Sequence, residues 1–257
     1  MLLEFAFLFS AGFFGGVLNS VAGGGSFITF PALLFVGVAP ISANATNTFA
    51  SCAGYLSGTY ALRDELFLHR KELPKIILIS LVGGMLGGWL LLKTPESVFR
   101  EAIPWLLLIA TVLFIFGAKI NRQLKQLVSH HRYAPVLGHF LLFLMLLGVC
   151  VYGGFFNAGL GVIALSYLAL AGYENINAMN GIKLLISSAV SLIAIVLFVY
   201  NGVIAWYEGT VVLLGALLGG YVAAHVSRRL SQHYVRAFVT SVSCSITAYF
   251  FIVTYAN

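Results

Sequence analysis

The chain has 257 residues, of which 60% are hydrophobic and only 9% are charged. Soluble domains carry about 25% charged residues, so this composition excludes a soluble fold and indicates an integral membrane protein. A transmembrane β-barrel is also excluded, because its strands alternate apolar and polar residues, whereas the run Trp105–Gly117 is continuously apolar.

Apolar runs predict an all-α integral membrane protein with about 8–10 transmembrane segments, since ~20 apolar residues cross a bilayer. Glu4 stands where a signal peptide needs basic residues, so we expect the first run to be a retained helix. The runs 25–37 and 159–172 are too short to cross comfortably alone, and each follows a polar break that contains glycine. The ten runs are 3–22, 25–37, 42–62, 74–92, 99–118, 135–157, 159–172, 177–200, 206–226 and 234–254.

The second half of the chain repeats the pattern of the first. The alignment that places Gly15 on Gly153 also places Gly16, Asn19 and Gly23 on Gly154, Asn157 and Gly161. Slightly smaller shifts superpose Gly37 on Gly172 and the run GGMLGG (83–88) on GALLGG (215–220). We therefore expect an internal duplication, with an N-terminal transmembrane repeat at 1–118, a cytoplasmic connecting loop at 119–134 and a C-terminal transmembrane repeat at 135–257.

Basic residues explain the net charge of +6 and predict the orientation of the two repeats. The breaks Arg63–Lys75, Lys119–Arg132 and Arg228–Arg236 hold four, four and three Lys or Arg residues, whereas the remaining breaks hold only Lys93 and Arg100. The positive-inside rule places the three basic breaks in the cytoplasm, so the charge does not indicate nucleic-acid binding. Five segments per repeat then give inverted-topology repeats, with both termini outside.

The two polar breaks, Asn19–Ser26 and Asn157–Gly161, predict paired broken helices. A break inside the membrane frees backbone groups, and hydrocarbon makes each unsatisfied group cost several kcal/mol. The N-terminus of a half-helix offers free N–H groups and a positive dipole end, which favour an anion. Inverted repeats with paired broken helices are typical of transporters whose substrate binds near the midplane. Close helix packing through small residues is the alternative interpretation of the glycines.

Polar residues also line one face of the third and eighth runs. At helical spacing these faces hold Asn44, Asn47, Thr48, Ser51 and Tyr55 in the first copy, and Asn180, Lys183, Ser187 and Ser191 in the second. Hydrogen bonds between helices, worth only ~0.6 kcal/mol each on average, are the alternative to a binding role for the serines and threonines.

Lys183 is the only Lys or Arg between Arg132 and Arg228, and it lies about two turns into an apolar run. A charge near the bilayer centre costs ~2.5–3.5 kcal/mol. We interpret Lys183 as a cation that holds an anionic substrate, and snorkelling of its ammonium to the surface is the alternative. The candidate substrate-binding residues are Asn19, Ser20, Gly23, Gly24, Gly25, Ser26, Asn44, Thr46, Asn47, Asn157, Gly159, Gly161, Asn180, Gly181 and Lys183.

The eight acids all lie near segment ends or in breaks, so no mid-segment carboxylate is placed as a proton relay or sodium ligand. An inside-negative potential already favours outward movement of an anion, by ~2.3 kcal/mol per charge per 100 mV. We therefore expect a transporter or facilitator, without catalytic residues, metal or cofactor, whose partners are a small anion and the lipid bilayer. A homodimer is compatible with this architecture.

The chain resembles the TauE/SafE sulfite exporter family over nearly its whole length. The resemblance rests on GGVLNSVAGGGSFITFPAL (15–33) and PISANATNTFASCAGYLSG (40–58), with support from NAMNGIK (177–183) and NGVIAW (201–206). It implies a multi-pass protein of the prokaryotic cell (inner) membrane that moves sulfite or related sulfur-containing or organic anions, usually outward. Gly181 and Ile182 depart from a Gly-Thr pair that is frequent in the family.

Two other classes of function fit the sequence less well. A membrane thiol/disulfide electron carrier should place cysteines at equivalent positions of the two copies, and Cys52, Cys150 and Cys244 are not equivalent. An intramembrane hydrolase is disfavoured because no GxSxG turn and no buried acid pair is present. Import, or facilitated movement of a sulfonate, thiosulfate or carboxylate, is the nearer alternative.

Overall fold

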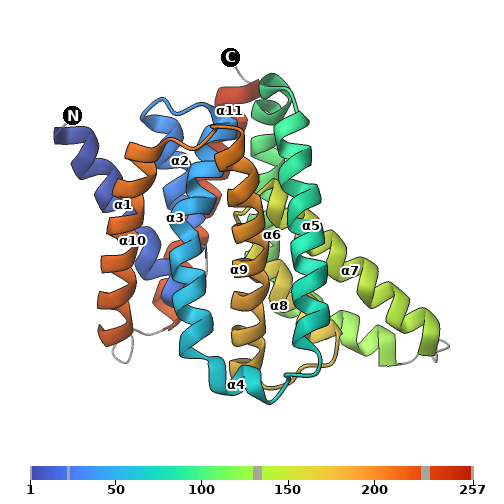
Figure 1. Ribbon diagram of the computed structural model, residues 1–257. Helices are drawn as coiled ribbons and strands as arrows, with labels where there is room; N and C mark the ends of the chain where they lie inside the picture. The colour runs from blue at the N-terminus through green and yellow to red at the C-terminus, as the bar shows by residue number, and fades with distance from the viewer. Residues whose placement is uncertain (1, 22–23, 130–134, 227–231, 256–257) are drawn as a thin grey trace.

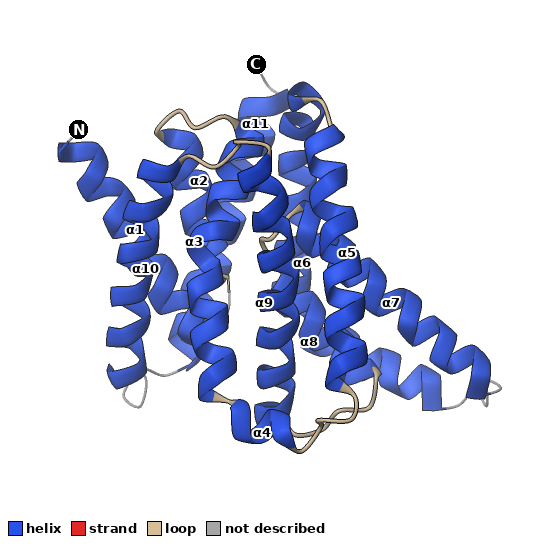
Figure 2. Cartoon of the chain, viewed as in Figure 1, coloured by secondary structure: helices blue, strands red, loops and turns tan. Residues whose placement is uncertain are grey.

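The computed structural model describes the backbone at residues 2–21, 24–129, 135–226 and 232–255, and the side chains of these residues except at 20–21, 118–129, 135–139, 224–226 and 232–236. The described residues form helices joined by short loops, without strands (Figures 1 and 2). The helices are α1 (Leu2–Val21), α2 (Ser26–Phe35), α3 (Pro40–Ala61), α4 (Arg63–Phe67), α5 (Leu73–Lys93), α6 (Glu96–Ser129), α7 (Pro135–Phe155), α8 (Leu160–Leu170), α9 (Ile176–Tyr200), α10 (Trp206–Val226) and α11 (Gln232–Tyr255).

Six of these helices are long and apolar enough, within the described residues, to cross a membrane. Their outward faces carry exposed apolar side chains such as Phe14, Trp89 and Leu218, which are suited to contact with lipid. The short helices α2 and α8 each follow a break, as expected. The fold class predicted from the sequence, an all-α multi-pass membrane protein, is thereby confirmed.

The helix boundaries differ from the expected segments at two places. A short helix, α4, occupies part of the basic break Arg63–Lys75. Helix α6 continues to Ser129, through most of the region 119–134 that we expected to be a connecting loop. Ile120, Leu124 and Val128 recur every fourth residue there, which is the spacing of one helix face, so a charged sequence continues as helix. The cytoplasmic location of this connection stays a prediction.

The main helix contacts join one half of the chain to the other, and they occur in matching pairs. Helix α1 packs against α10 and its counterpart α7 packs against α5, while α3 and α9 pack against each other. Helices α3 and α9 run antiparallel, because Thr59 near the end of α3 contacts Ser188 and Thr46 near its start contacts Ala205, beyond the end of α9. Antiparallel counterparts favour an inverted duplication, which remains an inference from packing.

Backbone conformations repeat as well. Gly24 and Gly159 precede the two half-helices with φ of 107° and 84°, and Gly37 and Gly172 follow them with φ of 90° and 94°. Side chains other than glycine rarely adopt this left-handed conformation. A single shift along the sequence superposes both Gly24 on Gly159 and Gly37 on Gly172, so the turns that bound α2 and α8 are equivalent.

Glycine allows the long helices to cross at backbone contact. A Cβ added to Gly16 of α1 would overlap the carbonyl oxygen of Ala216 in α10, and one added to Gly219 would overlap that of Phe13. On the other side of the molecule, a Cβ on Gly87 of α5 would overlap the carbonyl oxygen of Val151 in α7. The two glycine runs therefore pack within one chain, as small residues do in membrane helix pairs.

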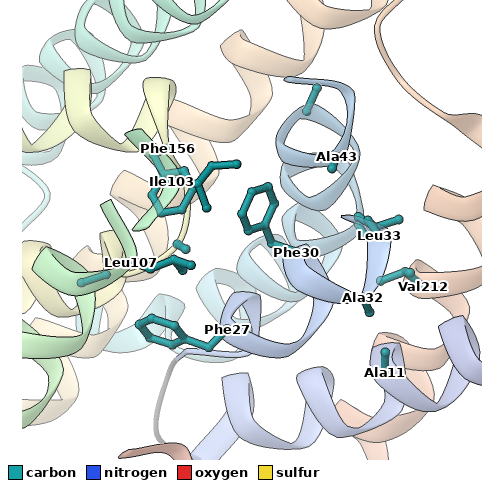
Figure 3. Packing of buried hydrophobic residues seen from close by; sticks show 14 of the residues in the cluster. Ala11, Phe27, Phe30, Ala32, Leu33, Ala43, Ile103, Leu107, Phe156 and Val212 are labelled. Atoms are coloured by element: carbon teal, nitrogen blue, oxygen red, sulfur yellow. The ribbon is translucent and has the colours of Figure 1, made fainter. Parts of the chain in front are cut away.

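Helix α2 is held by aromatic packing in the interior. Phe27 and Phe30 are fully buried and point toward α6, where Ile103 and Leu107 lie, and toward Phe156 in the second break (Figure 3). The rings of Phe30 and Phe156 meet edge to face, with centroids 5.4 Å apart. The first half-helix is thus anchored directly on the break that precedes the second.

The glycine crossing of α5 and α7 generates a first prediction. Gly87→Ala should destabilise the folded protein by about 1–3 kcal/mol, because the new methyl group must push two helix backbones apart. Thermal unfolding of the purified protein in detergent measures the change. Gly148→Ala is the matched control on α7, since a Cβ there meets nothing within 4 Å. Equal midpoints for the two variants would show that the close crossing does not constrain the fold.

Candidate functional site

The two breaks are the structural basis of the candidate site. Helix α1 ends at Val21 and α2 begins at Ser26, while α7 ends at Phe155 and α8 begins at Leu160. The left-handed residues Gly24 and Gly159 turn the chain into the half-helices. Gly23 and the side chain of Ser20, both candidates from the sequence, lie outside the described residues.

Close packing accounts for part of the glycine content. A Cβ on Gly25 would overlap the carbonyl oxygen of Gly15 in α1, and one on Gly159 would lie 2.7 Å from the Cβ of Ala110 in α6. Asn19 lies beside the same contact, since its Cβ is 3.1 Å from the Cβ position of Gly25. Packing through small residues, the alternative weighed for these glycines, therefore applies to Gly25 and contributes at Gly159.

A buried cluster of polar side chains joins α2 to α3. Thr29 Oγ1 donates a hydrogen bond of 2.5 Å to Asn47 Oδ1, and Asn47 Nδ2 donates one of 3.2 Å to Ser26 Oγ. All three side chains are buried, with Asn47 fully inaccessible. The first half-helix is thereby hydrogen-bonded through its first turn to the polar face of α3.

A second set of bonds continues from α3 into the other half of the chain. The Tyr55 hydroxyl donates to Asn157 Oδ1 at 2.8 Å, and Asn157 Nδ2 donates to Ser191 Oγ of α9 at 3.2 Å. Asn47 and Tyr55 lie on the same face of α3 at helical spacing, so the two sets are neighbours along that face. We call these six residues the central polar network: Ser26, Thr29, Asn47, Tyr55, Asn157 and Ser191.

Two further candidates tie α3 to the second half. Asn44 Nδ2 donates to the carbonyl oxygen of Phe155, the last residue of α7, at 2.9 Å. Thr46 Oγ1 accepts a hydrogen bond from the backbone N–H of Ala205 at 3.0 Å. These contacts satisfy a helix end and a loop that would otherwise leave buried backbone groups unpaired.

Lys183 lies against the first turn of α8. The carbons of its side chain pass beside Gly161, with Cδ 3.5 Å from the position a Cβ would take. Its ammonium donates to Asn180 Oδ1 at 3.1 Å. Gly181 faces elsewhere, toward Leu62 and Leu66. The structure thus brings Lys183, Asn180 and Gly161 together and separates them from Gly181.

The first turn of α8 retains an available donor beside Lys183. Leu160 N–H donates to Asn157 O, and Val162 N–H donates to the carbonyl oxygen of Gly159. The N–H of Gly161 has no such acceptor among the described residues. A cationic side chain and an unpaired N–H at the positive end of a helix dipole therefore lie side by side.

Three members of the network, Thr29, Tyr55 and Ser191, are not among the candidate binding residues from the sequence, although Tyr55 and Ser191 are on the predicted polar helix faces. Thr29 lies three residues after Ser26 and so on the same helix face. Ser191 is on the predicted polar face of α9, where hydrogen bonding between helices is the alternative to a binding role. The described residues contain no group of three or more His, Cys, Asp or Glu side chains that could hold a metal ion.

Two hollows lie at opposite ends of the molecule. The larger, about 700 Å³, is bounded by α5, α7 and the α8–α9 connection, with Lys75 and Tyr173 among its lining residues. Burial, with the hydrogen bond that the Tyr173 hydroxyl donates to Glu72, raises the pKa of Tyr173. The smaller, about 280 Å³, lies between the α2–α3 and α9–α10 connections. Neither is lined by Lys183 or the central polar network.

Comparisons with known proteins agree with this architecture. The family described as sulfite exporter TauE/SafE matches residues 8–250. The chain is 28% identical to a "Probable membrane transporter protein" of Haemophilus influenzae over 95% of this chain and 92% of that protein. It is 28% identical to YfcA of Escherichia coli, over 94% and 87% of the two chains, and 31% identical to ORF9 of a Sinorhizobium species, over 94% and 90%. YfcA and ORF9 are likewise each described as a "Probable membrane transporter protein". No solved structure matches the chain.

The central polar network generates a second prediction. Tyr55→Phe should lower the free energy of unfolding by about 1–3 kcal/mol, because it leaves the buried acceptor Asn157 Oδ1 without its donor. Tyr60→Phe on the same helix is the control, since the Tyr60 side chain is exposed and its ring contact with Arg63 survives the change. Thermal unfolding in detergent compares the two, and an unchanged midpoint for Tyr55→Phe would contradict the structural importance of the bond.

Proposed function

This chain belongs to the TauE/SafE sulfite exporter family, and from that premise we propose that it moves a small sulfur oxyanion, such as sulfite, outward across the prokaryotic inner membrane. The relatives support a membrane transporter. The anion, the direction and the site are our proposal. The observation that carries it is the position of Lys183 beside the first turn of α8.

Lys183 has the properties of an anion-binding group. It is half-buried, and within the described part of the chain its ammonium has one partner, the neutral amide oxygen of Asn180. A charge placed in a membrane segment without an acidic partner is costly, and such residues are mostly functional. A bound anion would offset this cost, and the N–H of Gly161 and the dipole of α8 would bind the same anion.

The central polar network gives the proposed site its connection to the rest of the protein. Asn157 lies in the break just before Gly161, and it is hydrogen-bonded to α3 and α9. Movement of one half of the chain against the other would change the Tyr55–Asn157 contact, because these two residues belong to different halves. Alternating access would then be a rocking or sliding of one repeat against the other, as inverted-repeat transporters do.

The distribution of charge supports outward movement driven by membrane potential. All eight acids are exposed or half-buried, so no carboxylate is enclosed in the interior as a proton relay. An inside-negative potential of 100 mV favours export of each negative charge by ~2.3 kcal/mol. The start of α1 and the end of α11 lie at the same side of the molecule, opposite α4 (Figure 1), in keeping with both termini outside and the basic break at Arg63–Lys75 inside.

Loss of the Lys183 charge should abolish most anion movement. In proteoliposomes with an imposed potential, Lys183→Gln should reduce sulfite flux about 10–100-fold, which corresponds to a charged hydrogen bond of about 1.5–3 kcal/mol. Lys93→Gln, an exposed lysine at the end of α5, is the control for net charge. Measurement with and without a pH gradient separates potential-driven flux from proton-linked flux.

Equal flux in the two variants would remove Lys183 from the site. Flux of sulfonate, thiosulfate or a carboxylate in place of sulfite, with the same dependence on Lys183, would keep the site and replace the substrate. Flux that runs only inward would reverse the proposed direction.

The alternative of a thiol/disulfide electron carrier makes a separate prediction. Cys52 and Cys150 are buried and Cys244 is exposed, all as free thiols. A variant with the three cysteines replaced by alanine or serine should therefore keep native flux. Flux lost in this variant, with its fold intact by thermal unfolding, would favour thiol chemistry.

A further inference from the structure

Among the side chains that the structure describes, one buried amide oxygen lacks a partner. The side chain of Asn44, on α3, is fully inaccessible. Its Nδ2 donates to the carbonyl oxygen of Phe155, whereas its Oδ1 makes no hydrogen bond. Leaving a buried acceptor unsatisfied costs about 1–3 kcal/mol, so a group that pairs with Asn44 Oδ1 would stabilise the protein.

The orientation of the amide is determined by its surroundings. Exchanging Oδ1 and Nδ2 would place the side-chain oxygen against the carbonyl oxygen of Phe155, and two acceptors repel each other. The unpaired atom is therefore the oxygen. Because Oδ1 and Nδ2 belong to one planar amide, this oxygen lies next to the last carbonyl group of α7.

Carbonyl groups in the last turn of α7 lack backbone donors. Phe156 N–H donates to the carbonyl oxygen of Tyr152, but no backbone N–H of residues 157–159 donates to the carbonyl groups of Gly153 or Gly154. Free carbonyl groups and the negative end of the helix dipole meet at this helix terminus. Asn44 is thus an unpaired acceptor beside a helix end that is itself rich in acceptors.

Aromatic side chains enclose the segment that ends α7. The ring of Phe155 packs against Phe99 with centroids 5.7 Å apart, and Phe156 packs against Phe30 (Figure 3). Phe30, Phe99 and Phe156 are all fully buried. An occupant would therefore be held without bulk water, by oxygen atoms of the protein.

We propose that Asn44 Oδ1 and the carbonyl end of α7 form a binding site for a dehydrated monovalent cation such as Na⁺. Asn44 Oδ1 and the free carbonyl oxygens of this helix end are all acceptors, so their partner must be a cation or a donor. Neutral oxygens without a carboxylate disfavour Mg²⁺ and Ca²⁺, which bind proteins through carboxylates. Unwound carbonyl groups and half-helix C-termini are the ligands that transporters of this architecture use for Na⁺.

The site has no counterpart at the equivalent position of the other repeat. Under the shift that superposes Gly37 on Gly172, the residue equivalent to Asn44 is Met179, which offers no oxygen, so one cation binds per chain. Asn44 belongs to the first half and α7 to the second, so the cation bridges the two halves. The cation could thus couple its own gradient to movement of the halves, without a carboxylate in the interior.

Thermal unfolding of the purified full chain in detergent tests this site without any transported anion. NaCl or KCl replaces N-methyl-D-glucamine chloride at constant ionic strength. A cation that binds only the folded protein should raise the midpoint saturably, by about 5 °C or more at a hundred times its dissociation constant. Asn44→Ala should lose the response.

Asn177→Ala is the control, because Asn177 is exposed at the start of α9, and it should respond as the native chain does. A native midpoint that is the same in Na⁺, K⁺ and N-methyl-D-glucamine would overturn the proposal and assign Asn44 Oδ1 to a buried water. A saturable rise in the midpoint that persists unchanged in Asn44→Ala would overturn it too. The measurement needs no sulfite, so its failure leaves the anion proposal standing.

Discussion

The absence of water from the bilayer interior is the constraint on which the rest of this structure depends. Two helices are broken inside an apolar protein, and each break exposes backbone groups that lipid cannot satisfy. Side chains meet part of this requirement, since Thr29 Oγ1 donates to the carbonyl oxygen of Gly25 and Asn44 Nδ2 donates to that of Phe155. Asn157 lies in one break and is bonded to α3 and α9, while Ser26 begins the half-helix after the other. Polar residues in these apolar segments are thus needed to support the breaks, and the breaks in turn present polar groups to a substrate.

Glycine allows the long helices of this structure to pack at backbone contact. Helices α1 and α10, and α5 and α7, cross at backbone contact, so four long helices form two closely packed pairs. Helices α3 and α9 lie between these pairs and carry the polar faces. An assembly of two similar units, each with a broken helix and a tightly crossed pair, has a natural boundary at which to move.

Among the described residues, two polar groups beside the second break, the Lys183 ammonium and Asn44 Oδ1, lack a partner of opposite charge and a hydrogen-bond donor respectively. Lys183 is a cation bonded to a neutral amide, next to the N-terminal end of α8. Asn44 Oδ1 is an acceptor without a donor, next to the C-terminal end of α7. The single break between these helices therefore presents its positive and negative dipole ends to two different unsatisfied groups. One break can in this way serve an anion on one side and a cation on the other.

The sequence by itself determined the helical membrane class, the order of the apolar segments and the two short helices, because each depends on composition or on spacing along one chain. The internal duplication stays a prediction from that spacing. The sequence also identified Lys183 as exceptional. Only the tertiary structure decided which polar residues meet: Tyr55 with Asn157, Asn44 with the end of α7, and Gly181 on a different face from Lys183. It also decided that Gly25 serves a helix contact. Helical periodicity assigns a residue to a face, but its partner depends on how that face crosses helices far along the chain, and no local pattern encodes that crossing.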